Sequence, residues 1–169
     1  MPVRSVMLRM ALPAVLLLSA CGDSLVGPPP SGFGRFDGRL NGTDWHGYGW
    51  AVLANDTLYL FGRRDINTET GVAEELRFSA EFIGQADHQI TNGVHAQVDR
   101  GEAEFSAPAS GQMRIVTYDG VVLIGNISVA NSGTGAWAFE AGDFDVPVFF
   151  SFEEVPDFPG PALPPTPGS

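Results

Sequence analysis

The sequence contains one cysteine, Cys21, and no lysine among its 169 residues. A single cysteine cannot form a disulfide within the chain, so the fold depends on packing and hydrogen bonds. The basic residues are nine arginines against 20 acidic residues, which gives a formal charge of −11. Because nucleic-acid binding rests on clustered positive charge, this balance predicts no nucleic-acid partner.

Long apolar runs are also missing. The most apolar stretch, residues 10–18, is interrupted by Pro13 and is far shorter than the roughly 20 residues that a membrane-spanning helix needs. The chain has no Gly-x-Ser-x-Gly motif, and no serine stands in a context that fixes a base beside it. We therefore expect a protein that is not an enzyme, with an envelope hydrolase or glycan-active enzyme as an alternative.

The N-terminal residues form a recognisable signal. Arg4 and Arg9 precede the apolar run, and Leu18-Ser19-Ala20-Cys21 ends it. This pattern resembles the signal peptide of bacterial lipoproteins. The resemblance implies cleavage between Ala20 and Cys21 and attachment of acyl chains such as palmitate to Cys21, so that the membrane is a partner through the lipid. Removal of Arg4 and Arg9, with no acidic residue, lowers the formal charge from −11 to −13.

The rest of the chain divides by composition. We expect a signal peptide over residues 1–20, the lipidated cysteine and a flexible Pro/Gly tether over 21–33, a single β-domain over 34–155, and a Pro-rich disordered tail over 156–169. The residue after Cys21 is glycine rather than the aspartate of inner-membrane sorting signals. This favours a lipid-anchored cell-envelope protein on the outer membrane, facing the periplasm.

Between the tether and the tail, apolar and polar residues alternate with a period of two, which is typical of half-buried strands. Asn41-Gly42, Asn55-Asp56 and Asp119-Gly120 predict hairpin turns. One loop is expected to hold Asp87 and Asn92-Gly93, and a turn is expected at Ala141-Gly142 before a strand over residues 144–152. The pattern predicts an all-β fold, an antiparallel β-sandwich of about ten strands, with a closed lipocalin-like barrel as the alternative.

The strand expected over residues 44–53 offers a binding surface. His46, Tyr48 and Trp50 lie on one face, and Trp45 stands on the other beside small residues. Rows of aromatic side chains bind sugars or apolar groups of a partner. We therefore predict a surface for a protein, glycan or small-molecule ligand made by Trp45, His46, Tyr48, Trp50 and Tyr59.

Metal ligands are few and scattered. His46, His88 and His95 lack the spacing that would bring them together as a zinc site. Asp143 and Asp145 are weak calcium candidates, as are the acids around Gly101, which are Asp99, Glu102 and Glu104. Neither run has the spacing of an EF-hand, so we predict no metal and no cofactor.

Four short motifs resemble a family of uncharacterised bacterial lipoprotein β-domains. They are Asn41-Gly42-x-x-Trp45, residues 111–119 before a hairpin, Gly125-Asn126-Ile127-Ser128-Val129, and Gly142-Asp143-Phe144-Asp145-Val146. The resemblance spans about residues 34 to 152 and implies a β-domain and an envelope address, with no activity attached.

Together these observations predict a lipid-anchored, non-enzymatic binding or interaction module. The alternative is a lipocalin-like carrier of an apolar small molecule. A carrier requires a large interior cavity, which we expect to be lined by Phe78, Phe82, Phe105 and Phe139, and a filled interior would contradict it.

Overall fold

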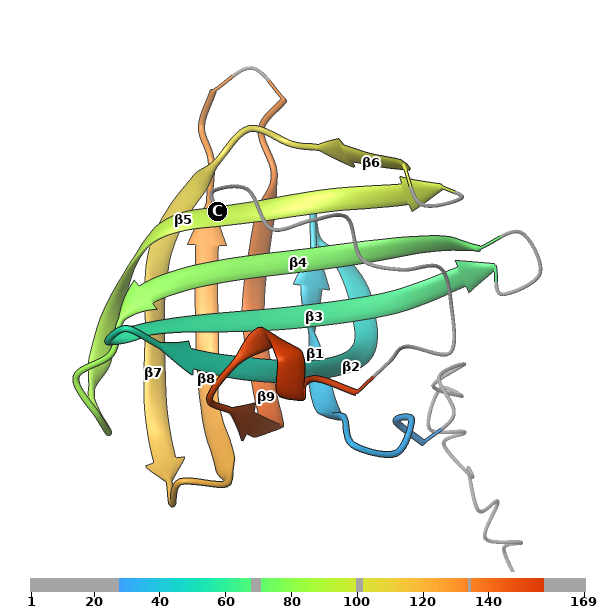
Figure 1. The fold of residues 1–169 in the computed structure, drawn as a ribbon. Helices are drawn as coiled ribbons and strands as arrows, with labels where there is room; N and C mark the ends of the chain where they lie inside the picture. The colour runs from blue at the N-terminus through green and yellow to red at the C-terminus, as the bar shows by residue number, and fades with distance from the viewer. Residues whose placement is uncertain (1–27, 68–70, 100–101, 134, 157–169) are drawn as a thin grey trace, which may run out of the picture.

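The computed structural model describes residues 28–67, 71–99, 102–133 and 135–156 (Figure 1). The strands are β1 (Gly34–Leu40), β2 (Thr43–Ala54), β3 (Thr57–Asn67), β4 (Val72–Glu81), β5 (Asp87–Asp99), β6 (Glu102–Phe105), β7 (Ala109–Tyr118), β8 (Val122–Ala130) and β9 (Ala138–Phe149), followed by the short 3-10 helix η1 (Phe152–Glu154). Within these ranges there is no α-helix and no helix long and apolar enough to cross a membrane. The all-β prediction is confirmed. The predicted signal peptide, Cys21 and most of the predicted tail lie outside the described residues.

The strands close into an antiparallel barrel of eight, in the order β4-β3-β2-β1-β9-β8-β7-β5. The ring is completed where β4 pairs with β5, from Ala73–Val98 to Ser79–Asn92. β6 pairs with β5 only and adds a short ninth strand outside the ring. The predicted sandwich is therefore wrong, and the barrel that was its alternative is observed. A sandwich and a barrel both need alternating apolar and polar residues along each strand. The pairing of β4 with β5, which closes the ring, distinguishes the two.

Local turn chemistry sets the hairpins. Asn41 and Gly42 have φ values of 52° and 78°, and Asn55 and Asp56 have 51° and 58°. Two successive positive φ values are those of a type I′ turn, whose twist matches that of the strands it joins. The turns predicted between β1 and β2 and between β2 and β3 are thereby confirmed.

Two predicted breaks are instead irregularities inside long strands. Asp87 and Asn92-Gly93 belong to β5, whose register with β7 shifts between Ile90 and Gly93. Ala141 and Gly142 belong to β9, where both residues stand opposite Gly38 of β1. Ala141 has a φ of 48°, so the extra residue is absorbed by a β-bulge and the strand continues. The described ranges therefore contain nine strands where about ten were expected.

Aromatic rings fill the barrel interior. The Phe36 ring lies 5.5 to 6.2 Å, between centroids, from the rings of Trp45, Phe78, Phe139 and Phe144. None of the five is more than 2% exposed. They form one continuous core cluster with aliphatic side chains from all the strands of the ring.

Inward-facing glycines make room for these rings. A Cβ atom on Gly38 would lie 2.4 Å from Cζ of Phe139, and one on Gly125 would lie 2.6 Å from Cζ of Phe144. The ring of Trp45 covers Gly47 in the same way, and that of Phe36 covers Gly62. Large and small residues thus alternate across the interior of the barrel, as its limited width requires.

Gly38→Ala tests this packing. The added methyl group meets the Phe139 ring, and we expect it to lower the free energy of unfolding by about 1–3 kcal/mol. Urea denaturation measures the change. The double variant Gly38→Ala/Phe139→Leu is the control, because a smaller side chain at position 139 relieves the clash and the two effects become non-additive. Strictly additive losses would show that the ring does not rest on Gly38.

Candidate functional site

The five residues predicted as a binding surface lie on two sides of the barrel wall. Trp45 points into the interior and is fully buried. Tyr48 and Trp50 point outward from β2 but are only 5% and 1% exposed. His46 is the accessible member on β2, and its Nδ1 lies 2.8 Å from Oδ1 of Asp37. No single exposed aromatic surface joins these residues.

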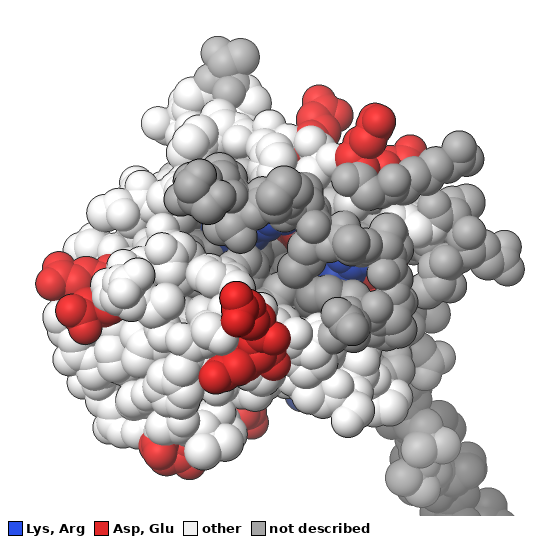
Figure 2. All heavy atoms as spheres, viewed as in Figure 1, with Lys and Arg blue, Asp and Glu red and all other residues white. Residues whose placement is uncertain are grey.

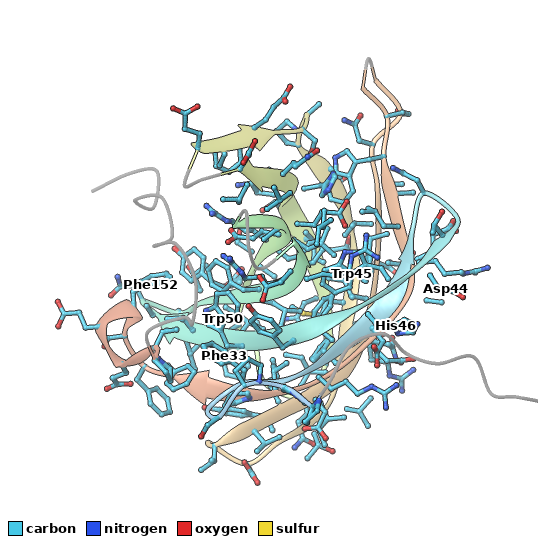
Figure 3. The ribbon with its side chains drawn as sticks, turned by 90° about the vertical axis from the view of Figure 1, so that its right-hand side faces the viewer. Phe33, Asp44, Trp45, His46, Trp50 and Phe152 are labelled. Carbon is cyan, nitrogen blue, oxygen red and sulfur yellow. The ribbon has the colours of Figure 1, made fainter. Side chains whose placement is uncertain are left out.

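An outer aromatic cluster accounts for the burial of the outward rings (Figure 3). Its members are Phe33, Tyr48, Trp50, Tyr59, Phe61, Phe149 and Phe152. Trp50 stacks on Phe61 at 4.9 Å, and Phe33 packs against Trp50 at 5.5 Å. Phe152 of η1 contacts Tyr59 at 5.3 Å. The predicted aromatic surface therefore binds the two ends of the described chain to the barrel wall.

Charged residues continue this wall along β3 and β4. Arg63 Nη1 donates to Oε1 of Glu75 at 2.8 Å, with both side chains 2% exposed, and Arg63 Nε donates to Asp65 at 3.0 Å. The Tyr48 hydroxyl donates to Asp65 at 3.0 Å, and burial raises the pKa of that hydroxyl. Buried charges require partners of this kind. This network has the features of a structural element of the wall.

A second polar cluster lies inside the barrel, near the end at which β1 finishes. Glu74 accepts a hydrogen bond from Nε1 of Trp45 at 3.1 Å and one from the Arg64 guanidinium. His95 Nε2 lies 3.7 Å from Oε1 of Glu74. The His95 imidazole and the Arg64 guanidinium hold the pKa of Glu74 well below its usual range, at about 2, against the opposing effect of burial. Arg64 Nε and His95 Nε2 are buried without hydrogen-bond partners.

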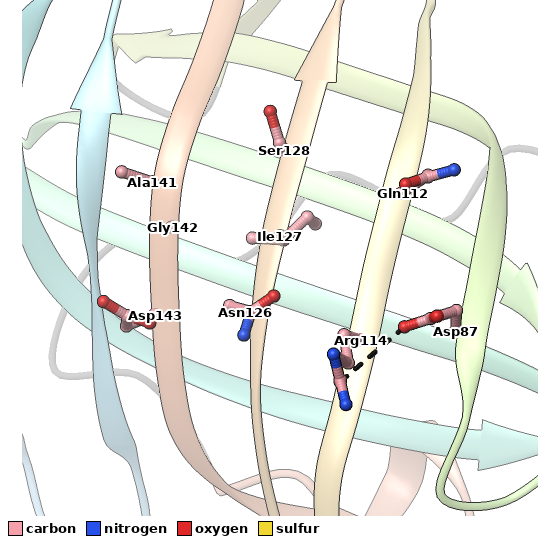
Figure 4. A pocket seen from close by; sticks show the side chains of 9 residues that line it. All are labelled: Asp87, Gln112, Arg114, Asn126, Ile127, Ser128, Ala141, Gly142 and Asp143. Carbon is pink, nitrogen blue, oxygen red and sulfur yellow. Dashed lines mark ion pairs between the residues drawn. The ribbon is translucent and has the colours of Figure 1, made fainter.

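The outer face of β5, β7, β8 and β9 carries a shallow hollow of about 520 Å³, here called the polar groove (Figure 4). Its polar side chains come from all of these strands, and they are Asp87, Gln112, Arg114, Asn126, Ser128 and Asp143. All of them are exposed. They combine carboxylate acceptors, a guanidinium donor, and amide and hydroxyl groups that both donate and accept.

Strand register places these side chains in rows. Asp143 is the register partner of Asn126, Asn126 of Arg114, and Arg114 of Asp87. Directly opposed residues of an antiparallel pair share one face of the sheet. The Ala141 bulge lies in the wall of the same groove, a position in which bulges re-aim neighbouring side chains. The row continues through Asp37 on β1 to His46.

The charges in the groove are loosely held. Arg114 Nε lies 3.8 Å from Oδ1 of Asp87, and the two side chains are 68% and 71% exposed. An exposed ion pair of this length contributes little to stability. Both groups are therefore available to a bound molecule.

The predicted metal candidates do not converge. Asp143 and Asp145 lie on β9 rather than in a turn, with their side chains exposed. His88 is buried, with its two ring nitrogens 2.8 and 2.9 Å from the carbonyl oxygens of Glu81 and Gly84. Across the described ranges, no three His, Cys, Asp or Glu side chains are grouped as a metal ion requires.

The hydroxyl groups and histidine rings that could serve as nucleophile and base are likewise not paired in the described residues. In the part of the chain that the structure describes, no serine or threonine hydroxyl hydrogen bonds to a histidine ring: His46 contacts Asp37, His88 contacts backbone carbonyls, and Ser106 accepts from the backbone of His95. The polar groove offers an array of hydrogen-bonding groups on the outer face of the barrel.

Glu74 predicts a pH dependence of stability. Its pKa of about 2 in the folded chain lies below the value near 4.5 expected when unfolded, so the ionised group stabilises the fold above pH 4.5. That contribution disappears as the pH falls from about 4.5 to 2. We expect Glu74→Gln to lower the free energy of unfolding by up to about 3 kcal/mol at neutral pH and by much less near pH 2.

Chemical denaturation of both proteins at several pH values measures this difference. Glu102→Gln, which removes an acidic group from an exposed position on β6, is the matched control. A Glu74→Gln deficit that stays constant from pH 7 to pH 2 would contradict the assignment.

Comparison with known proteins adds no relative: no family model matches the chain, and no curated protein or solved structure is significantly similar to it.

Proposed function

We propose that this protein is a lipid-anchored binding module of the cell envelope, held on the outer membrane facing the periplasm by acyl chains on Cys21, and that it is not an enzyme. The N-terminal signal pattern supports the anchor. The observation that carries the binding role is the polar groove, where exposed hydrogen-bonding side chains from β5, β7, β8 and β9 surround one hollow.

The chemistry of the groove favours a hydroxyl-rich ligand such as a glycan. A sugar hydroxyl donates one hydrogen bond and accepts others. The amides of Gln112 and Asn126 and the hydroxyl of Ser128 match both roles, and Arg114 and Asp143 add a charged donor and a charged acceptor. A strongly charged ligand fits less well, since groups of both signs line the groove.

A second candidate is the lipocalin-like carrier of an apolar small molecule, which the closed barrel favours over a sandwich. The residues expected to line its cavity do not support it equally. Phe78 and Phe139 are interior and buried, but they pack on other rings, and Phe105 lies on β6 with 47% of its surface exposed. Phe82 packs against Tyr118 at 5.1 Å. A carrier role requires these interior rings to separate.

Binding in the groove is tested by titrating the ¹⁵N-labelled protein with neutral oligosaccharides, namely maltotriose, cellotriose and chitotriose. We expect amide shifts to concentrate at Arg114, Asn126 and Ser128. Asn126→Ala removes a central hydrogen-bonding group and is expected to weaken binding about tenfold. Gln97→Ala, at an exposed site on β5 outside the groove, should leave binding unchanged.

Other outcomes of the same titration are also informative. No shift with any of the three sugars would contradict a glycan ligand. Shifts at the amides of Phe36 and Phe139 on adding a medium-chain fatty acid, with none in the groove on adding sugars, would favour the carrier instead.

The anchor is tested by Cys21→Ser. Acylation needs the thiol, so we expect this variant to remain an uncleaved precursor that incorporates no palmitate label. Intact mass spectrometry of both proteins after membrane extraction measures cleavage and acylation together. A cleaved or palmitate-labelled Cys21→Ser protein would contradict the assignment.

A further inference from the structure

Large exposed apolar side chains gather at the end of the barrel where β1 begins and β9 finishes. Those of Ile83, Val116, Val121 and Phe150 are 55% to 66% exposed, and Phe152 is 40% exposed. We call these five residues the apolar rim. They come from the β4–β5 connection, the β7–β8 hairpin and the segment after β9, so they are distant in sequence.

Hydrogen bonds show that the segments bearing the rim are neighbours. Gln85 Nε2 donates to the Tyr118 carbonyl at 3.1 Å, and Ile115 N–H donates to the Ala86 carbonyl at 2.9 Å, which ties the β4–β5 connection to β7. Val148 N–H donates to the Val121 carbonyl at 2.8 Å, which ties the β7–β8 turn to β9. The residues of the apolar rim therefore lie on neighbouring segments at one end of the barrel.

The N-terminal segment joins the barrel at this same end. Phe33 is held in the outer aromatic cluster immediately before β1 begins at Gly34. Gly32 and Pro156 adjoin, since a Cβ atom on Gly32 would lie 2.8 Å from Cγ of Pro156. Pro28 is the seventh residue after Cys21, and a chain of that length spans at most about 25 Å. A lipid on Cys21 would therefore keep this end of the barrel closest to the bilayer.

We propose that the apolar rim rests on the interfacial layer of the membrane, so that the barrel stands with one defined end on the lipid surface. This inference rests on the proposed anchor at Cys21. Acyl chains on Cys21 would hold the protein at one point, and a second apolar contact would fix the orientation of the barrel on the surface. Apolar side chains exposed as one group mark such contact surfaces.

Charge selects the kind of lipid. Asp119 stands in the turn beside Val121, and the backbone N–H groups of Val122 and Val121 hold the pKa of its carboxyl below the usual range. Glu153 and Glu154 directly follow Phe152 and are exposed. The face shown in Figure 2 carries separate acidic patches and little basic surface. The rim therefore suits a zwitterionic surface, such as phosphatidylethanolamine, and is repelled by anionic lipid.

The test uses the full-length lipidated protein. Because Cys21 is the only cysteine in the sequence, a second cysteine can be labelled selectively. With Cys21 acylated, Val121→Cys and Ile83→Cys each introduce the sole free thiol for an environment-sensitive nitrobenzoxadiazole dye. Ile66→Cys, at a 52% exposed position near the opposite end of the barrel, is the matched control. Each labelled protein is reconstituted in phosphatidylethanolamine/phosphatidylcholine vesicles that contain a lipid-borne quencher, and mass spectrometry reports the lipid on Cys21.

We expect blue-shifted emission and quenching by the lipid-borne quencher at positions 121 and 83, neither at position 66, and less quenching at 121 and 83 as phosphatidylglycerol is added. Equal quenching at all three positions, or none at 121 and 83 in protein whose mass shows the lipid, would overturn the rim contact while leaving the anchor intact. A mass that shows no lipid on Cys21 would overturn the anchor and the orientation with it. Thermal unfolding of each labelled protein confirms that the barrel is intact.

Discussion

The barrel depends on one kind of contact, in which an aromatic ring packs against a glycine of a strand. Phe139 on Gly38, Phe144 on Gly125 and Trp45 on Gly47 each occupy space that a methyl group would take. Eight strands enclose little volume, and a core of bulky side chains on every inward position would not fit. Glycines in strand interiors cost conformational entropy, and here the buried area of the rings offsets that cost.

Much of the local structure can be predicted from the sequence, because it is encoded over a few residues. The alternation along β2 and the Asn-Gly and Asn-Asp turns predict hairpins whose observed φ values agree. Closure of the ring is different. It depends on the pairing of β4 with β5, while β1 pairs with β9 about a hundred residues away along the chain. The alternation within one strand does not identify the strand that pairs with it. The bulge at Ala141 also escapes prediction, because a non-glycine residue with positive φ is uncommon and Ala-Gly resembles a turn.

The site shows the same division. The aromatic residues of β2 are assigned to the correct faces by their alternation, yet alternation does not tell exposed rings from covered ones. The cover comes from Phe33 and Phe152, at opposite ends of the described chain. The polar groove was not predicted from the sequence, because none of its residues belongs to a recognisable binding motif. Gln112, Asn126 and Ser128 are outward positions on separate strands, and the only available signal was that these positions carry hydrogen-bonding rather than simple charged side chains.

The position of β1 between two neighbouring strands has a consequence for how the barrel would respond to a pull on its N-terminal end. Its first residue follows directly on Phe33, and it is hydrogen-bonded on one side to β2 and on the other to β9. With the proposed anchor at Cys21, a pull on the barrel would enter the fold at the start of β1. Such a force must shear two ladders of hydrogen bonds at once instead of peeling them apart singly. Paired on both sides, β1 is thus well placed to resist being drawn out of the barrel.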